Sequence, residues 1–526
     1  MRDDGSKLEP DAMDLSRPGR TGVALPASGV PPADAPPPEL LRDGLHLPEL
    51  SQLDVVRHFT RLSQLNWSID THMYPLGSCT MKLNPKVNDA IAALAGFAEA
   101  HPMQPADDVQ GALAVMHGLQ EQLAEITGMA GASLAPMAGA QGELAGIRVI
   151  KAWLDTNGGA KRTRVLVPDS AHGTNPATAS MAGFDVVSVR SRPDGDMDLD
   201  ALREALEHHG HAVAALMITL PSTLGLFDRN IVEIARLVHA HGAQMYGDGA
   251  NLNAMLGQVK PGDLGFDVMH INLHKTFSQP HGGGGPGAGP IAVKAHLVDY
   301  LPAPHVVLQG DRTREAASTG APPPPPVGAP PLHSVERGPG GEASTLHPPP
   351  SSARYVLNTP KHTIGRMGAF HGNFGVLVRA YAYIRSLGPD GLRAISEAAV
   401  LNANYVQARL RGAYDLAHDR TCMHEVVFSG ARQKAQGAKT LDIAKRMIDY
   451  GYHPPTIYFP LVVEEALMVE PTESETKETL DAFCDAMLQI AEEARTQPAL
   501  LREAPHTAPL RRLDEAAAAR RPRLRW

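Results

Sequence analysis

Along the middle of the chain, short apolar runs and amphipathic segments follow one another, which predicts strands and helices in alternation. The apolar runs have the length of buried strands and cover residues 164–168, 184–189, 212–218 and 266–273, and residues 243–246 form the close of another short strand. Between them, apolar residues recur at helical spacing over residues 200–208 and 231–241. Strands that alternate with helices usually build a parallel sheet, so the pattern predicts an α/β fold with a doubly wound, mostly parallel sheet.

The pattern changes on both sides of this region, and these changes predict the domain boundaries. The N-terminal segment is rich in proline and alanine and carries one amphipathic helix over residues 50–64, so we expect an extended arm. Long proline and glycine runs after residue 305 predict an insertion or linker. The expected parts are an arm at 1–66, a large α/β domain at 67–305, a proline-rich insertion at 306–354, a small C-terminal α+β domain at 355–500 and a tail at 501–526.

Further elements are predicted outside the central alternation. Helical periodicity covers residues 108–127, and an apolar helix over 144–153 follows a turn of small residues. In the small domain we expect short strands at 425–429, 456–459 and 468–470 and helices at 441–450 and 477–493.

Composition narrows the function classes. The 526 residues are 43% hydrophobic and carry a formal net charge of −9, which argues against a general nucleic-acid-binding surface. Three cysteines without CxxC spacing favour a reducing compartment and argue against a disulfide scaffold or a zinc site. We find no 18-residue apolar run and no apolar signal core at the N-terminus. A cytoplasmic protein without a metal or a membrane partner is therefore expected.

Polar side chains follow the ends of the predicted strands, where ligands bind in open α/β sheets. Asn175, Thr223, Asp248 and Lys275 are in such places, and a glycine run at 282–285 allows close backbone approach after Lys275. A lysine beside glycines is ordinarily a surface-loop residue. However, a pyridoxal phosphate (PLP) site needs a lysine amine and an acid for the ring nitrogen. We therefore predict that Lys275 forms a Schiff base with PLP and that Asp248 keeps the pyridine nitrogen protonated.

Each of the other candidate site residues has both a functional and a structural interpretation. The small residues at 138–143 open a helix and can bind a phosphate through backbone N–H groups, or only cap the helix. His172 can stack on the cofactor ring or cap a turn, and Arg366 can bind a carboxylate or act structurally. Cys79 can be a reactive thiol or a small buried residue.

Several segments together resemble a known family, the PLP-dependent P-protein of the glycine cleavage system, glycine dehydrogenase (decarboxylating). More narrowly, the chain is similar to subunit 2 of the split, two-chain form. Three departures stand out: residues 313–352 look like an insertion, Leu220 stands where the family usually has an asparagine, and Met367 and His371 differ from the commoner residues in their turn. The most specific matches are Tyr74–Lys82, Ala171–Ala177, Pro221–Phe227, Asp248–Asn253, Asn272–Phe277, Arg366–Ile384 and His453–Thr472.

The resemblance implies the PLP-dependent transferase fold of type I and a set of residue roles. Lys275 would be the Schiff-base lysine, Asp248 the pyridinium partner and His172 the ring-stacking residue, and these are the expected catalytic residues. Ala250 would lie against the opposite ring face, and Thr223 is counted with the cofactor-binding residues. Gly139, Ala140 and Gln141 would bind the phosphate, with His274 as a helper.

The implied activity is decarboxylation of glycine, with transfer of the aminomethyl group to the lipoyl arm of the H-protein and release of CO2. The implied partners are glycine dehydrogenase subunit 1, in a heterotetramer, and the lipoylated H-protein, with the T- and L-proteins acting in the same system. Two alternatives remain open at the level of sequence. One is a PLP amino-acid decarboxylase that releases a free amine, and the other is a non-catalytic scaffolding subunit.

Overall fold

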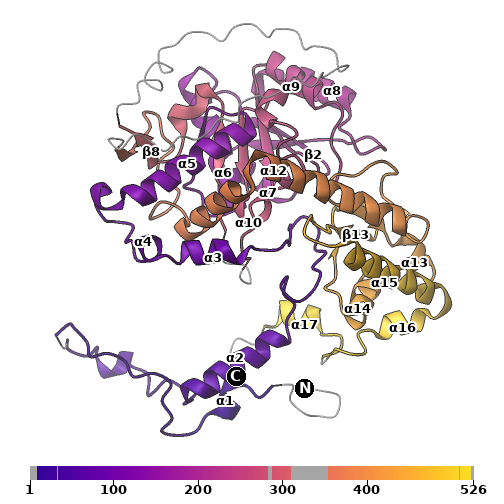
Figure 1. Cartoon of the computed structure of the whole chain (residues 1–526). Coiled ribbons are helices and arrows are strands. Elements are labelled where there is room, and N and C mark those ends of the chain that lie inside the picture. The colour runs from indigo at the N-terminus through magenta and orange to yellow at the C-terminus, as the bar shows by residue number, and fades with distance from the viewer. Residues whose placement is uncertain (1–8, 32, 282–286, 310–353, 509, 523–526) are drawn as a thin grey trace.

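The computed structural model describes residues 9–31, 33–281, 287–309, 354–508 and 510–522 (Figure 1). The glycine run at 282–285 and the proline runs near 322–326 and 348–350 lie outside these ranges, so their predicted roles stay predictions.

A seven-stranded sheet in the order β1-β7-β6-β5-β4-β2-β3 forms the centre of the larger body. Strands β2 to β6 pair in parallel, and β7 runs antiparallel to both of its neighbours. The predicted mostly parallel sheet is therefore confirmed, while the three-residue strands β1 and β7 are too short to show a sequence pattern. The bounds are β1 (Gly131–Ser133), β2 (Arg164–Pro168), β3 (Asp185–Val189), β4 (Val213–Thr219), β5 (Gln244–Gly249), β6 (Val268–Ile271) and β7 (Ile291–Val293).

Helices cover both faces of this sheet, which explains why its strands are continuous apolar runs. Along β4, Ala215 and Met217 pack in the core cluster of the α6 side, whereas Leu216 and Ile218 pack in the cluster of the α9 side. Alternate side chains point to opposite faces, and here both faces are buried. The covering helices are α5 (Gln110–Thr127), α6 (Gly139–Thr156), α7 (Thr174–Met181), α8 (Leu199–His209), α9 (Ile231–Ala240) and the first half of α12 (Phe374–Leu410).

A second, antiparallel sheet in the order β10-β11-β13-β12 lies beyond the large one. Helix α12 connects the two bodies in Figure 1. It is broken at Gly388, which has a φ of +63° and is followed by Pro389. The predicted strand at 456–459 is shorter than expected. The bounds are β10 (Asp415–Leu416), β11 (Val426–Ser429), β12 (Thr456–Ile457), β13 (Ala466–Val469), α13 (Ala431–Ala435), α14 (Thr440–Asp449), α15 (Lys477–Thr496) and α16 (Pro498–Glu503).

The chain ends and the connections complete the fold. Helices α1 (Ala12–Leu15) and α2 (Gln52–Gln64) belong to an arm that extends away from the large sheet, as Figure 1 shows. Strands β8 (His305–Leu308) and β9 (Tyr355–Asn358) pair antiparallel. Within the described ranges, no helix is both long and apolar enough to cross a membrane. The remaining helices are α3 (Lys86–Ala92), α4 (Ala95–Ala98), α10 (Leu273–Thr276) and α17 (Glu515–Arg520).

Candidate active site

A cavity of about 480 Å³ opens where the carboxyl ends of the parallel strands meet the small sheet. This volume is in the range of small-molecule and cofactor sites. The large body contributes residues from β5, α6 and α10, and the opposite wall comes from residues 77–79 and from Thr456 and Phe459. Among its lining residues are the predicted site residues Lys275, Asp248, His172, Ala250, Thr223, His274, Gly139 and Ala140.

Lys275 is half-buried in α10, the short helix that follows β6. The backbone of this turn is held by hydrogen bonds from Ile271 N–H to Pro290 O and from Leu273 N–H to Ala288 O. Within the described part of the chain, no hydrogen bond or ion pair is recorded for the lysine amine. The amine is therefore available to a ligand in the cavity.

Asp248 is near the end of β5, with 2% of its surface exposed. Its carboxylate accepts hydrogen bonds from Ala250 N–H at 2.9 Å and from the Thr219 hydroxyl at 3.2 Å. Hydrogen bonds to the charged form stabilise a carboxylate. These two hydrogen bonds fix the Asp248 carboxylate in the cavity wall, where it can pair with a protonated ring nitrogen.

His270, which the sequence analysis did not single out, stands beside Asp248 because parallel β5 and β6 pair these two residues. Its Nε2 lies 3.3 Å from Asp248 Oδ1, and its Nδ1 lies 2.9 Å from the Tyr246 hydroxyl. Burial lowers the pKa of His270, so the ring is neutral at physiological pH. A neutral ring has one N–H, and the nearby carboxylate favours that proton on Nε2, with the Tyr246 O–H donating to Nδ1.

Tyr246→Phe tests this arrangement, because it removes the hydroxyl and keeps the ring. The fully buried Nδ1 of His270 would lose its donor, which costs about 1–3 kcal/mol of folding free energy. We expect a lower urea midpoint with an unchanged slope against urea. An unchanged midpoint would contradict the assigned tautomer.

Glu143 is a second residue that the sequence analysis missed, because its segment was interpreted only as a helix start. The side chain is 5% exposed on α6 and lines the cavity. Burial, followed by the charge of Asp248, raises the pKa of Glu143 to about 9. The Glu143 carboxyl is therefore protonated at neutral pH and adds no second negative charge beside Asp248.

The start of α6 can bind an anion. The helix begins at Gly139, five residues earlier than predicted, and its N-cap residue Ala138 makes no side-chain capping bond. The first backbone N–H groups of a helix lack intrahelical partners, so they can bind a phosphate. A Cβ on Gly139 would lie 2.5 Å from Asn272 Oδ1, an atom that itself has no partner among the described residues. Only glycine fits this close approach.

Gln141 and His274 are both predicted at the phosphate, but only His274 lines the cavity with its side chain. The Gln141 side chain is not in the cavity wall: it accepts a hydrogen bond from Met137 N–H and donates one to Met367 O. Its long side chain is used to tie the helix start to a neighbouring loop, so only its backbone remains for a phosphate. His274 does line the cavity, and burial, together with the charge of Lys275, lowers its pKa to about 4. His274 is therefore neutral.

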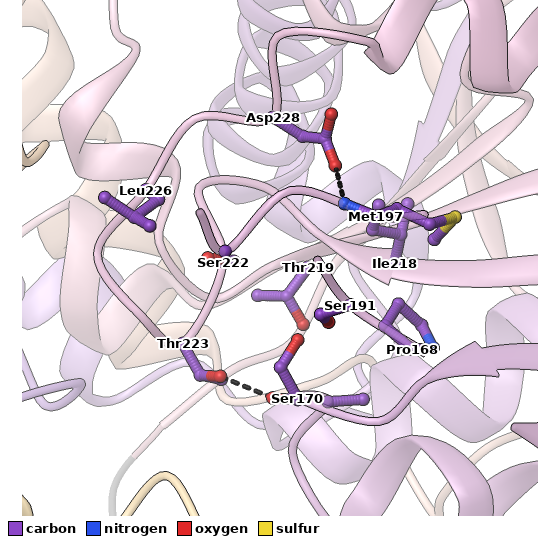
Figure 2. A pocket seen from close by; sticks show the side chains of 12 residues that line it. Pro168, Ser170, Ser191, Met197, Ile218, Thr219, Ser222, Thr223, Leu226 and Asp228 are labelled. Carbon is purple, nitrogen blue, oxygen red and sulfur yellow. Dashed lines mark hydrogen bonds between the residues drawn. The ribbon is translucent and has the colours of Figure 1, made fainter. Parts of the chain in front are cut away.

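His172 is exposed at the rim of the cavity and meets Phe459 edge-on, with ring centroids 5.7 Å apart. Its Nδ1 also accepts the Thr174 N–H, so the histidine caps the start of α7 while it faces the cavity. Thr223 donates to the Ser170 carbonyl, as Figure 2 shows. Thr223 also lines the pocket drawn in Figure 2, whose volume of about 20 Å³ leaves room for about one water.

These residues fit PLP: within the described ranges, an amine without a partner, a buried carboxyl group, a helix start without a side-chain cap and polar atoms without hydrogen bonds surround one cavity. The C-terminal domain model of glycine dehydrogenase matches residues 395–506, and the β-eliminating lyase model matches residues 97–284. A probable glycine dehydrogenase (decarboxylating) subunit 2 from Caldanaerobacter subterraneus subsp. tengcongensis is 52% identical over 98% of both chains. The chain belongs to this family. The corresponding protein of Halalkalibacterium halodurans is also 52% identical, over 98% of this chain and 97% of its own.

Solved structures agree on the fold. A crystal structure of glycine decarboxylase (P-protein) of the glycine cleavage system, in inhibitor-bound form, has a TM-score of 0.66 at 21% identity and covers 86% of this chain and 93% of its own. A cysteine desulfurase from Thermococcus onnurineus has a TM-score of 0.56 at 14% identity and covers 82% and 98%. The fold is PLP-dependent fold-type I, as predicted. Leu220, the departure noted in the sequence, is fully buried in the apolar core.

Proposed function

We propose that this chain is the PLP-binding subunit of a glycine dehydrogenase, which decarboxylates glycine and transfers the aminomethyl group to a lipoyl arm with release of CO2. The proposal rests on one observation: the amine of Lys275 lies in the same cavity as the buried carboxylate of Asp248, which two hydrogen bonds hold in place. The names of the relatives support the substrate, and the family membership supports the cofactor.

The roles of the chain's own residues follow from the site. When bound, PLP withdraws electrons from the α-carbon of an amino acid, which allows CO2 to leave. Lys275 would hold the cofactor covalently, and Asp248 would keep a proton on its ring nitrogen. The N–H groups at Gly139 and Ala140 would bind its phosphate, while His172 and Ala250 would lie against opposite faces of its ring. Glu143 and His270 are both neutral, so neither adds a charge beside the Asp248 carboxylate.

The partners follow from the relatives, whose names identify them as subunit 2 and so indicate a partner subunit. We infer that subunit 1 and a lipoylated H-protein act with this chain, and that the T- and L-proteins process the product. The three cysteines form no disulfide bonds, which supports the proposal that the protein acts in the reducing cytoplasm.

The proposed function is tested with the purified chain and glycine, with and without subunit 1 and a lipoylated carrier protein. We expect rapid CO2 release only when both are present, with one aminomethyl group gained by the carrier per CO2. Release of methylamine without the carrier would instead identify a simple decarboxylase, and no CO2 under any condition would identify a scaffold.

A further inference from the structure

Two carboxyl groups of the small sheet meet behind the wall of the cavity. Strands β11 and β13 pair antiparallel with Val426 opposite Val469, so Glu425 and Glu470 face each other just beyond the strand ends. Both side chains are fully buried. One carboxylate oxygen each of Glu425 and Glu470 and one ring nitrogen of the neighbouring His424 all lie within 4.8 Å of one another.

Each acid holds one backbone N–H of the loop that forms the cavity wall. Ser78 N–H donates to Glu425 Oε2 at 2.7 Å, and Thr80 N–H donates to Glu470 Oε2 at 2.9 Å. Ser78 and Thr80 have φ of +59° and +50°, a left-handed conformation that costs energy for residues other than glycine. The two acids therefore stabilise this loop and fix Ser78 at the cavity.

Ser78 connects Glu425 to the cavity by a group that can pass a proton. Its hydroxyl lies 3.2 Å from both Glu425 oxygens, and Ser78 lines the cavity. Asn251 also lines the cavity and contacts Glu425 at 3.5 Å. The oxygen of a hydroxyl can accept a hydrogen bond while its O–H donates another, so a proton can pass along it. An amide NH₂ group only donates hydrogen bonds. The route from Glu425 to the cavity thus runs through Ser78.

Two buried carboxyls at this separation cannot both be ionised, because like charges in a site of low polarity repel strongly. Burial, followed by the charge of Glu470, raises the pKa of Glu425 to about 8, and burial also raises the pKa of Glu470. Neither ring nitrogen of His424 makes a hydrogen bond among the described residues, although Nε2 lies 3.9 Å from Glu470 Oε1, and burial lowers the pKa of His424 to about 3. The other ionisable groups around the pair are Lys275, Cys79, Cys422, Glu473 and Lys82, and Lys82 is ion-paired with Glu473.

The reaction of the proposed function, on which this inference rests, consumes one proton. Loss of CO2 from glycine leaves an electron pair on carbon, which forms a C–S bond with one sulfur of the lipoyl disulfide. The S–S bond breaks, and its electron pair leaves on the other sulfur as a thiolate. The carbon is oxidised and the disulfide is reduced, and the thiolate needs one proton to become the thiol product.

We propose that Glu425, which stays protonated beside the second buried carboxyl of Glu470, supplies this proton to the departing sulfur through the Ser78 hydroxyl. Glu425 acts through Ser78 and does not touch the substrate, so it is a positioning residue and Ser78 is the catalytic one. The pair takes its proton back from solvent before the next turnover.

The test compares Glu425→Gln and Ser78→Ala with wild type and with Glu464→Gln, an exposed glutamate on the same body whose side chain is 68% exposed. All are studied as holoenzymes with subunit 1, lipoylated carrier and glycine. Glutamine keeps an acceptor for the Ser78 N–H but carries no acidic proton. Cofactor absorbance shows whether each variant is folded with an intact Lys275 site.

For wild type and Glu464→Gln, we expect transfer to be fast at neutral pH and to fall as pH rises through about 8, because the protonated form is the donor. Glu425→Gln and Ser78→Ala are expected to transfer about a hundredfold more slowly. In Glu425→Gln the fall near pH 8 should disappear. The infrared difference spectrum between wild type and Glu425→Gln at pH 7 should show the loss of one carboxylic-acid band, independently of activity, while the band of protonated Glu143 is common to both proteins and cancels.

Several results would overturn the proton route. They are a wild-type rate and pH profile in Glu425→Gln, a difference spectrum between wild type and Glu425→Gln without a carboxylic-acid band, or a stoichiometric metal ion bound at His424, Glu425 and Glu470. If wild type itself transfers nothing to the carrier, the proposed function and the proton route fail together. If wild type transfers normally and Glu425→Gln does too, only the proton route fails.

Discussion

Replacing Lys275 with alanine is expected to abolish the visible absorbance of the bound cofactor and to lower glycine decarboxylation by about four orders of magnitude or more. The side chain is half-buried in α10, and its amine is the cavity's free nucleophile. Alanine cannot form the covalent link, so the cofactor would be held by non-covalent contacts alone. Borohydride treatment of wild type, followed by peptide mapping, should identify the peptide with Lys275.

The Lys275→Arg variant tests whether a positive charge at this position is enough without a nucleophilic amine. The guanidinium keeps the positive charge but stays protonated in proteins, so it offers no neutral nitrogen nucleophile. We expect the same loss of absorbance and activity as in the alanine variant. Lys161→Ala, at an exposed lysine before β2, is the matched control and should behave as wild type. A Lys275→Ala enzyme that keeps its coloured, borohydride-reducible cofactor would defeat the proposed site.

Replacing Asp248 with asparagine should lower the rate of decarboxylation by about 10²- to 10³-fold, the usual cost of losing one preorganised electrostatic contact. The neutral amide would no longer stabilise a proton on the ring nitrogen. Its NH₂ group would also face the Ala250 N–H or the Thr219 hydroxyl, which now donate to the two carboxylate oxygens. We therefore expect weaker cofactor binding in addition to the slower reaction.

The measurement for Asp248→Asn is the cofactor absorbance as a function of pH together with the rate at saturating glycine. The spectrum should report a deprotonated ring nitrogen across the range in which the wild type keeps it protonated. Asp185→Asn, on an exposed position of β3, is the matched control. Wild-type spectra and rates in Asp248→Asn would show that another group holds the ring proton.

The linear sequence by itself determined the order of strands and helices in the large body, and it predicted Asp248 and Lys275 as site residues, which line one cavity in the structure. Apolar runs such as 212–218 have strand length, and they are continuous because helices bury both faces of the sheet. Asp248 and Lys275 could be predicted because each follows such a run, and parallel strands place their carboxyl ends along one edge. This inference needs only local pattern and the general rule for open sheets.

Only the tertiary structure decided which groups surround these two residues. His270 lies beside Asp248 because of the register between β5 and β6, and Glu425 faces Glu470 because of the register between β11 and β13. Ser78 reaches Glu425 across 347 positions of sequence. Strand register, burial and the partner of each buried polar group depend on contacts between distant segments, and a local pattern of hydrophobic and polar residues carries no record of them.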